Sequence, residues 1–141
     1  VLIGFVPSEN EINCFENSGE PFYYTGERKP TKFGFKNLKY FVPYISGKGV
    51  KECYEIIGYE VLKRKDIFEI NHPLFKDEEN ERLILRLGAK FEIDKRRYLK
   101  LNGPIGQVPY RYTNLKNIRA PINNKIELLI VGKINRKLYL D

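Results

Sequence analysis

The chain has very few of the side chains on which metal sites and hydrolases depend. It contains one histidine and two cysteines, so the four ligands of a structural zinc site cannot be assembled from them. A Ser/His or Cys/His pair could form only through His72, which lies in an acidic stretch typical of the surface. Only three serines occur, none in a nucleophile-elbow motif, and the phosphate-binding sequence GxxxxGKS/T is absent. We therefore expect no metal, no cofactor and no independent catalysis.

The two cysteines, Cys14 and Cys53, have no neighbouring Cys or His. They are expected to be small buried side chains in a reducing cytosol, although spacing alone does not decide whether they form a disulfide. No apolar run approaches the roughly 20 residues that span a bilayer. The first residues, VLIGFV, lack the basic flank and cleavage site of a signal peptide. We expect a cytoplasmic domain without membrane contact.

Methionine is absent, and the chain begins at Val1. We expect a fragment of a longer protein, unless only the initiator is missing. The length is that of one domain with a sizeable core, and 42% hydrophobic and 30% charged residues are typical of a globular protein. The prediction is a single domain over residues 1–141, with any oligomerisation through another part of the longer protein.

β-Branched and aromatic residues are abundant, and they are densest in two runs, 38–45 and 50–62. The connection 46–49, Ser-Gly-Lys-Gly, is typical of a β-hairpin loop. Gly58 interrupts the second run, which predicts a bulge or a barrel corner. Pro43 cannot donate a ladder hydrogen bond, which predicts that the first strand lies at a sheet edge or ends there.

Other patterns complete the predicted fold. A capping box at Ser8 and Glu11 predicts a first short helix, and Thr113 or Asn114 is expected to cap a second. A bend is expected at Gly88. Further strands are predicted at 1–6, 22–25, 82–93, 98–101, 126–131 and 134–140. The sum is an α+β domain, a small and partly open β-barrel of about six strands flanked by short helices.

The net charge of +7 is unevenly distributed along the chain. Residues 26–51 carry seven basic side chains against one acid, and residues 94–119 repeat this ratio. Residues 66–81 carry six acids against one lysine. Such segregation predicts that the two basic segments bind nucleic acid or another polyanion, and ordinary solvated surface is the alternative.

Aromatic and basic residues are interleaved at 22–29 and 110–112, and tyrosines also occur in the predicted hairpin. Aromatic rings stack on unpaired bases, and Lys and Arg bind phosphates. Most rings must pack in the core, but adjacent tyrosines in one strand face opposite sides. The predicted base contacts are Tyr23, Tyr24, Tyr44, Ser46 and Tyr110. The predicted phosphate contacts are Arg28, Lys29, Lys32, Lys36, Lys48 and Arg111.

The order of strand, capped helix, Phe-Tyr-Tyr at 22–24, basic loop and FVPYISGKGVKECYEIIGYEV resembles the PUA-like superfamily, closest to its EVE and YTH branches. The segment PYRYTNLKNI is similar to a late part of PUA-like domains attached to restriction nucleases and helicases. The resemblance implies a partly open barrel that binds RNA or DNA and receives a modified base in an aromatic cage. YTH cages use tryptophan, which this chain lacks, so a cage here must use Tyr or Phe, with Tyr23 or Tyr24 at the matching place.

The resemblance also implies a host, an archaeal McrB-type restriction protein with a separate GTP-hydrolysing motor. In that host this chain would be the amino-terminal domain that targets the complex to DNA. The alternatives are an RNA-binding PUA-like domain, a protein-interaction or assembly domain with an incidental basic surface, and a small nuclease or RNA-modifying enzyme. The Glu27-x-Lys29 spacing of some nucleases lacks a preceding aspartate, so we treat this match as chance.

Overall fold

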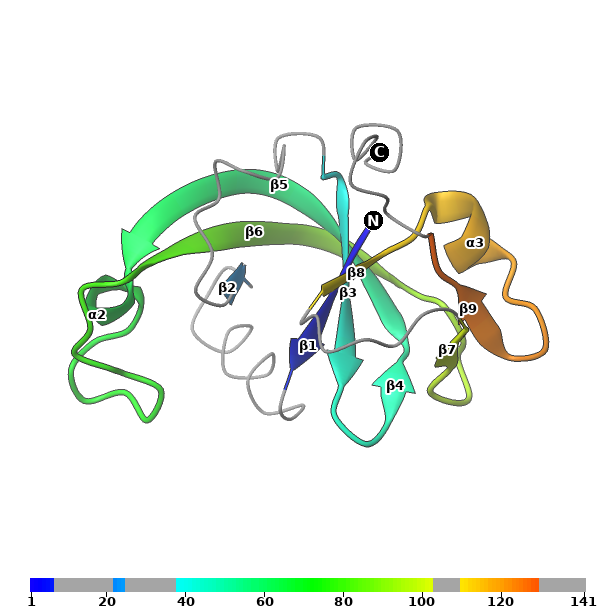
Figure 1. Ribbon diagram of the computed structural model, residues 1–141, viewed down its shortest axis with the longest axis horizontal. Coiled ribbons are helices and arrows are strands. Elements are labelled where there is room, and N and C mark those ends of the chain that lie inside the picture. Colours follow the sequence, from blue (N-terminus) through cyan, green and yellow to red (C-terminus); the bar gives the residue numbers. More distant parts are fainter. Residues whose placement is uncertain (7–21, 25–37, 103–109, 130–141) are drawn as a thin grey trace.

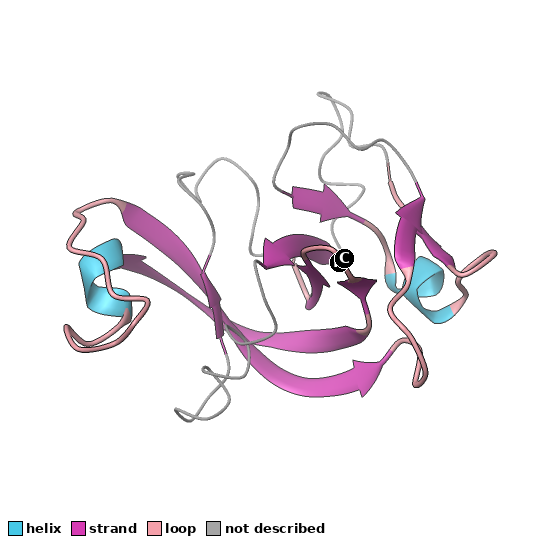
Figure 2. Cartoon of the chain, turned by 90° about the horizontal axis from the view of Figure 1, so that it is seen from below, coloured by secondary structure: helices cyan, strands magenta, loops and turns pink. Residues whose placement is uncertain are grey.

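The computed structural model describes residues 1–6, 22–24, 38–102 and 110–129, which are mainly strands (Figures 1 and 2). The strands are β1 (Leu2–Val6), β2 (Phe22–Tyr24), β3 (Tyr40–Ile45), β4 (Gly49–Val50), β5 (Glu52–Lys63), β6 (Glu81–Glu92), β7 (Lys100–Asn102), β8 (Tyr110–Tyr112) and β9 (Lys125–Glu127). The helices are α2 (Arg64–Ile67) and α3 (Leu115–Arg119). Neither of these two described helices is long and apolar enough to cross a membrane. The predicted α+β class is confirmed.

Seven strands form one sheet in the order β2-β6-β5-β3-β1-β8, with β4 paired to β3, and β7 and β9 form a second sheet. In the described part of the chain, the end strands β2 and β8 do not pair with each other, so the sheet does not close into a barrel. The predicted strands at 22–25, 98–101 and 126–131 are present as β2, β7 and β9, the run 50–62 is divided into β4 and β5, and the three-residue strand β8 was not predicted. Such short strands give little periodicity in sequence.

The longest pairing joins β5 and β6, which arch together across the molecule (Figure 1). Their register shifts between Tyr54 and Ile56 and shifts back between Ile56 and Gly58, which confirms the predicted bulge. Gly88 lies in the opposing stretch of β6, where an added Cβ would be 2.6 Å from Cγ2 of Ile57. Glycine at position 88 therefore leaves room for the side chain of Ile57, which lies within the stretch of β5 where the register shifts.

The predicted hairpin is present, but the inference from Pro43 is wrong because β3 lies inside the sheet, between β5 and β1. Tyr40 and Phe41 pair with β5, whereas Tyr44 and Ile45 pair with β4. Pro43 falls between these two pairings, where the neighbour of β3 changes. A proline is tolerated there because its missing N–H interrupts neither of the two short ladders.

Each face of the large sheet carries its own core, because alternate residues of a strand point to opposite faces. Leu2 and Val6 of β1 belong to one buried cluster, and Val1 and Ile3 belong to the other. Cys53 is buried in the second cluster. Its predicted burial is thus confirmed, whereas Cys14 lies outside the described residues.

The second predicted helix is confirmed as α3. The side chain of Asn114 accepts a hydrogen bond from the backbone N–H of Asn117 at 2.8 Å, as expected of an N-cap. Buried Thr113 donates its hydroxyl to the carbonyl of Glu127 at 2.6 Å, which holds β9 beside the helix. The helix predicted from Ser8 and the strand predicted at 134–140 lie outside the described residues.

Candidate nucleic-acid interface

The described parts of the two basic segments lie side by side at the turn between β3 and β4. Val50 donates its N–H to the carbonyl of Leu99 at 2.9 Å, and Leu99 returns a bond to Val50 at 2.7 Å. This bridge brings the turn at 46–48 close to the start of β7. Residues far apart in sequence thereby contribute to one surface.

Lysine side chains gather around Tyr98 on this surface. The Nζ atoms of Lys48 and Lys51 lie 5.6 and 5.5 Å from the centroid of the Tyr98 ring, within the range of cation–π attraction. Nζ of Lys100 donates to the carbonyl oxygen of Lys48 at 3.0 Å. Lys125 is the register partner of Lys100 across β7 and β9 and so shares its face. We call Lys48, Lys51, Tyr98, Lys100 and Lys125 the basic patch.

The electrostatics of the basic patch favour an anionic ligand. In the described part of the chain, no carboxylate forms an ion pair with Lys51, Lys100 or Lys125. Like charges held together raise the free energy of the folded chain, and a bound anion lowers it again. A ligand with repeated negative charges could neutralise several ammonium groups at once.

The structure places Tyr23, a predicted base contact, in the buried cluster that contains Leu2 and Val6. Its side chain is only 9% exposed, and its ring centroid lies 4.2 Å from that of Phe41. The ring also lies over Gly4, where an added Cβ would be 2.8 Å from Cζ and from the hydroxyl oxygen of Tyr23. A base could reach this ring only if the core opened, so Tyr23 stabilises the fold here.

The other predicted base contacts lie on three strands and a turn. Tyr44 is half-buried on β3, and Ser46 is exposed in the turn, where its N–H donates to the carbonyl of Val6 at 2.9 Å. Tyr24 belongs to β2, and Tyr110 pairs with Gly4 across β8 and β1. The side chains of Tyr24 and Tyr110 lie outside the described part of the structure. Tyr44 and Ser46 thus lie at and just after the end of β3, whereas Tyr23 belongs to the other buried cluster.

Among the predicted phosphate contacts, Lys48 belongs to the basic patch. Arg111 pairs with Ile3 through β8, and its side chain is outside the described part. The rest of the predicted set also lies outside the described residues: Arg28, Lys29, Lys32 and Lys36. Lys100 lies in the second basic segment, for which nucleic-acid binding was predicted, but neither Lys100 nor Tyr98 was named as an individual contact. Their alternation with Leu99 in a predicted strand was the available signal, because it places both on the face opposite Leu99.

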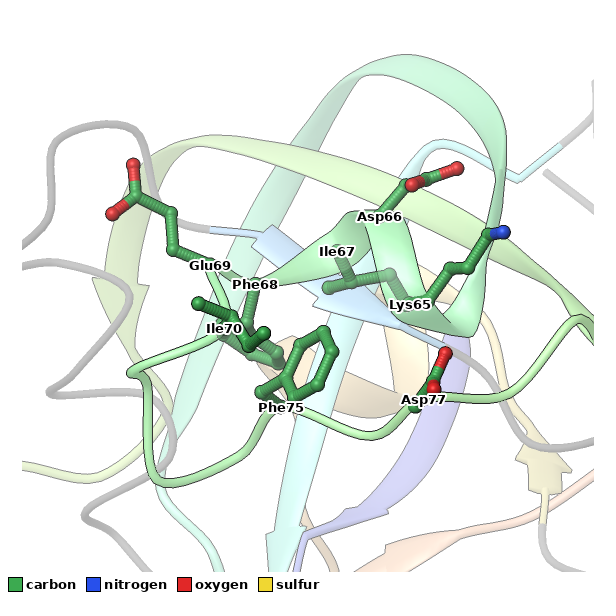
Figure 3. A pocket seen from close by; sticks show the side chains of 8 residues that line it. All are labelled: Lys65, Asp66, Ile67, Phe68, Glu69, Ile70, Phe75 and Asp77. Carbon is green, nitrogen blue, oxygen red and sulfur yellow. The ribbon is translucent and has the colours of Figure 1, made fainter.

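A hollow of about 560 Å³ lies at the far end of the β5–β6 ribbon from the basic patch (Figures 1 and 3). It has an apolar floor and a rim with three carboxylates, and we call it the acidic hollow. Its lining residues are Lys65, Asp66, Ile67, Phe68, Glu69, Ile70, Phe75 and Asp77. Its carboxylates repel phosphate, so the acidic hollow does not extend the nucleic-acid interface.

His72 has a structural role beside the acidic hollow. Its ring stacks on Phe68 with centroids 4.3 Å apart, and its Nδ1 accepts the N–H of Leu74 at 3.0 Å. The buried guanidinium of Arg64 donates to the carbonyl of Leu74 at 2.6 Å and lies 5.6 Å from the Phe68 ring centroid. These contacts hold the connection between β5 and β6 in place and use the one histidine of the chain.

A pH titration tests the geometry of this connection. Hydrogen bonds from Lys65 at 2.6 Å and from Lys63 at 2.9 Å lower the pKa of Glu79 from 4.5 to about 2. Because the folded pKa is depressed, the stabilisation is present above about pH 4.5 and is lost as the pH falls towards 2. Carboxyl NMR should show a titration midpoint near 2 for Glu79.

Lys65→Gln should raise that midpoint, and added salt should raise it too because the carboxylate is exposed. A midpoint near 4.5 in the unaltered chain would show that these ion pairs do not form in solution.

Two observations bear on the identity of the site, one on groups of metal-ligating side chains and one on known relatives. The described residues contain no group of three or more His, Cys, Asp or Glu side chains that could hold a metal ion. No family model, curated protein or solved structure matches the chain. The PUA-like resemblance therefore stays a prediction, and the function has to be inferred from the geometry.

Proposed function

We propose that the chain is a nucleic-acid-binding module and that the basic patch is its contact surface. One observation carries the proposal, the convergence of Lys48, Lys51 and Lys100 around the β3–β4 turn and Tyr98. Lys48 lies in the turn, Lys51 between β4 and β5, and Lys100 on β7, so three separate positions contribute charge to one surface. A nucleic-acid backbone has the repeated charge that such a surface can neutralise.

Salt dependence tests this function. Each phosphate neutralised by a lysine releases condensed counterions, so affinity should fall as salt rises. If the four lysines of the basic patch each meet a phosphate, the slope of log affinity against log salt should be about −3 to −4. Fluorescence titration of labelled DNA and RNA oligonucleotides should then show a loss of about a hundredfold between 50 and 200 mM salt.

Polyglutamate of similar charge is the control ligand, because it is anionic but carries no phosphates or bases. Equal affinity for polyglutamate would identify a general polyanion surface. No measurable binding to nucleic acid at the lowest salt would refute the proposed function.

Two finer parts of the proposal rest on the sequence resemblance alone. The first is that the ligand is DNA rather than RNA and contains a modified, flipped base. The second is that the chain targets a McrB-type restriction complex. With Tyr23 in the core, an aromatic cage would need Tyr24, Tyr44 or Tyr110. Titrating modified against unmodified oligonucleotides of the same sequence tests the first part, and equal affinities would refute it.

A further inference from the structure

Phe5 differs from its neighbours in β1, which is otherwise a buried strand. Gly4 and Val6 are buried, but the side chain of Phe5 is 37% exposed. Its register partner in the parallel pairing with β3 is Tyr44, and the two ring centroids lie 4.9 Å apart with an interplanar angle of 54°. Because the rings are inclined, they cannot both lie parallel to one flat ligand. Phe5 is the more exposed of the two residues, and half-buried Tyr44 packs against it.

This ring pair lies next to the turn that carries part of the basic patch. The carbonyl of Val6, the residue after Phe5, accepts the backbone N–H of Ser46. The backbone N–H of Lys48 closes the turn by donating to the carbonyl of Ile45 at 2.9 Å. Tyr44 pairs with Val50, which in turn pairs with Leu99, so these residues share the face of Phe5. Lys100 follows Leu99 and belongs to the opposite face, from which its Nζ reaches the turn at the carbonyl of Lys48. The turn, which contains Lys48, therefore lies between the exposed ring of Phe5 on one face and Lys100 on the other.

We infer that Phe5 is a stacking platform for an unpaired base and that Tyr44 positions the Phe5 ring. This inference rests on the proposed function. A strand crossing the β3–β4 turn would place a base on Phe5 and neighbouring phosphates at Lys48 and Lys100. In a duplex both faces of each base are covered by its neighbours, whereas an unpaired base offers a face to a protein ring. The ligand class is accordingly single-stranded nucleic acid, or a duplex with unpaired bases.

The test compares Phe5→Leu with Phe5→Tyr, which differ in whether an aromatic face remains. One base–aromatic stack contributes enough that Phe5→Leu should bind a short oligodeoxythymidylate about tenfold more weakly. Phe5→Tyr should bind it like the unaltered chain. The duplex control is the same oligodeoxythymidylate paired with oligodeoxyadenylate. The unaltered chain, Phe5→Leu and Phe5→Tyr should bind this duplex equally, and the unaltered chain should bind it more weakly than the single strand.

Equal binding of the single strand by Phe5→Leu and the unaltered chain would overturn the inference, and so would an equal loss for single strand and duplex. Thermal unfolding checks that each variant is folded.

Photocrosslinking of bromouracil-containing single strand to the unaltered chain requires no variant. Crosslinks at Phe5 or Tyr44 support the platform, and crosslinks found only elsewhere refute it. If neither nucleic acid binds at all, the proposed function fails as well. Salt-sensitive binding that ignores Phe5 refutes only the platform.

Discussion

Replacing Lys48, Lys51 and Lys100 together with glutamine is expected to weaken nucleic-acid binding about a hundredfold. Each lost ammonium–phosphate contact should cost about 1 kcal/mol, and a total of about 3 kcal/mol corresponds to that factor. Glutamine keeps a long polar side chain, so the change removes charge more than bulk. The slope of log affinity against log salt should become shallower by about 2 to 3 because three phosphates are no longer neutralised. Titrations at two salt concentrations measure both effects.

The matched control replaces three exposed lysines outside the basic patch, Lys39, Lys76 and Lys116, with glutamine. This triple variant has the same net charge as the first, so it lowers long-range attraction by a similar amount. It should bind nearly as well as the unaltered chain. If both triple variants lose the same affinity, net charge rather than the basic patch controls binding.

Gly49→Ala should destabilise the protein by about 3 kcal/mol. Gly49 has a φ of 121°, a backbone conformation that residues with a side chain rarely adopt. An added Cβ would be 2.3 Å from the carbonyl oxygen of Leu99. That oxygen cannot move away freely because it accepts the N–H of Val50 at 2.9 Å. Relief of the contact would therefore break the bridge that joins the two basic segments. Urea unfolding should show a lower midpoint, and nucleic-acid affinity should fall along with it.

Gly47→Ala is the matched control in the same turn. Gly47 also has a positive φ, of 78°, but an added Cβ there would have no atom within 4 Å. Only the backbone preference is lost, at about 1 kcal/mol. The difference between the two variants isolates the contact with Leu99. Equal losses of stability would show that backbone conformation alone requires the two glycines.

Much of the fold was predictable because its signals are local. The hairpin loop, the bulge near Gly58 and the cap at Asn114 depend on residues a few positions apart. The position of β3 inside the sheet was not predictable from Pro43. β3 pairs with β5 before the proline and with β4 after it, so the proline interrupts neither pairing. Whether a sheet closes likewise depends on pairings between distant segments, which no local pattern records.

The site was predictable only in part, for the same reason. Lys48 was found because it lies in a glycine-containing turn within a basic segment. Tyr98 was missed because its importance arises from the pairing of Val50 with Leu99, which joins remote parts of the chain. Tyr23 had the right residue type and neighbours for a stacking role. Its burial depends on Gly4, whose missing Cβ leaves room for the ring in the core.

The distance between the basic patch and the acidic hollow affects how the molecule would approach a polyanion. The field of the polyanion attracts one end of the elongated β5–β6 ribbon and repels the other, so it exerts a torque on the protein before contact. Encounters should therefore begin with the β3–β4 turn facing the ligand more often than random tumbling would give. After binding, the carboxylates of the acidic hollow would point outward, and neighbouring copies on one strand would repel each other there. Copies should accordingly be spaced along the strand instead of clustering on it.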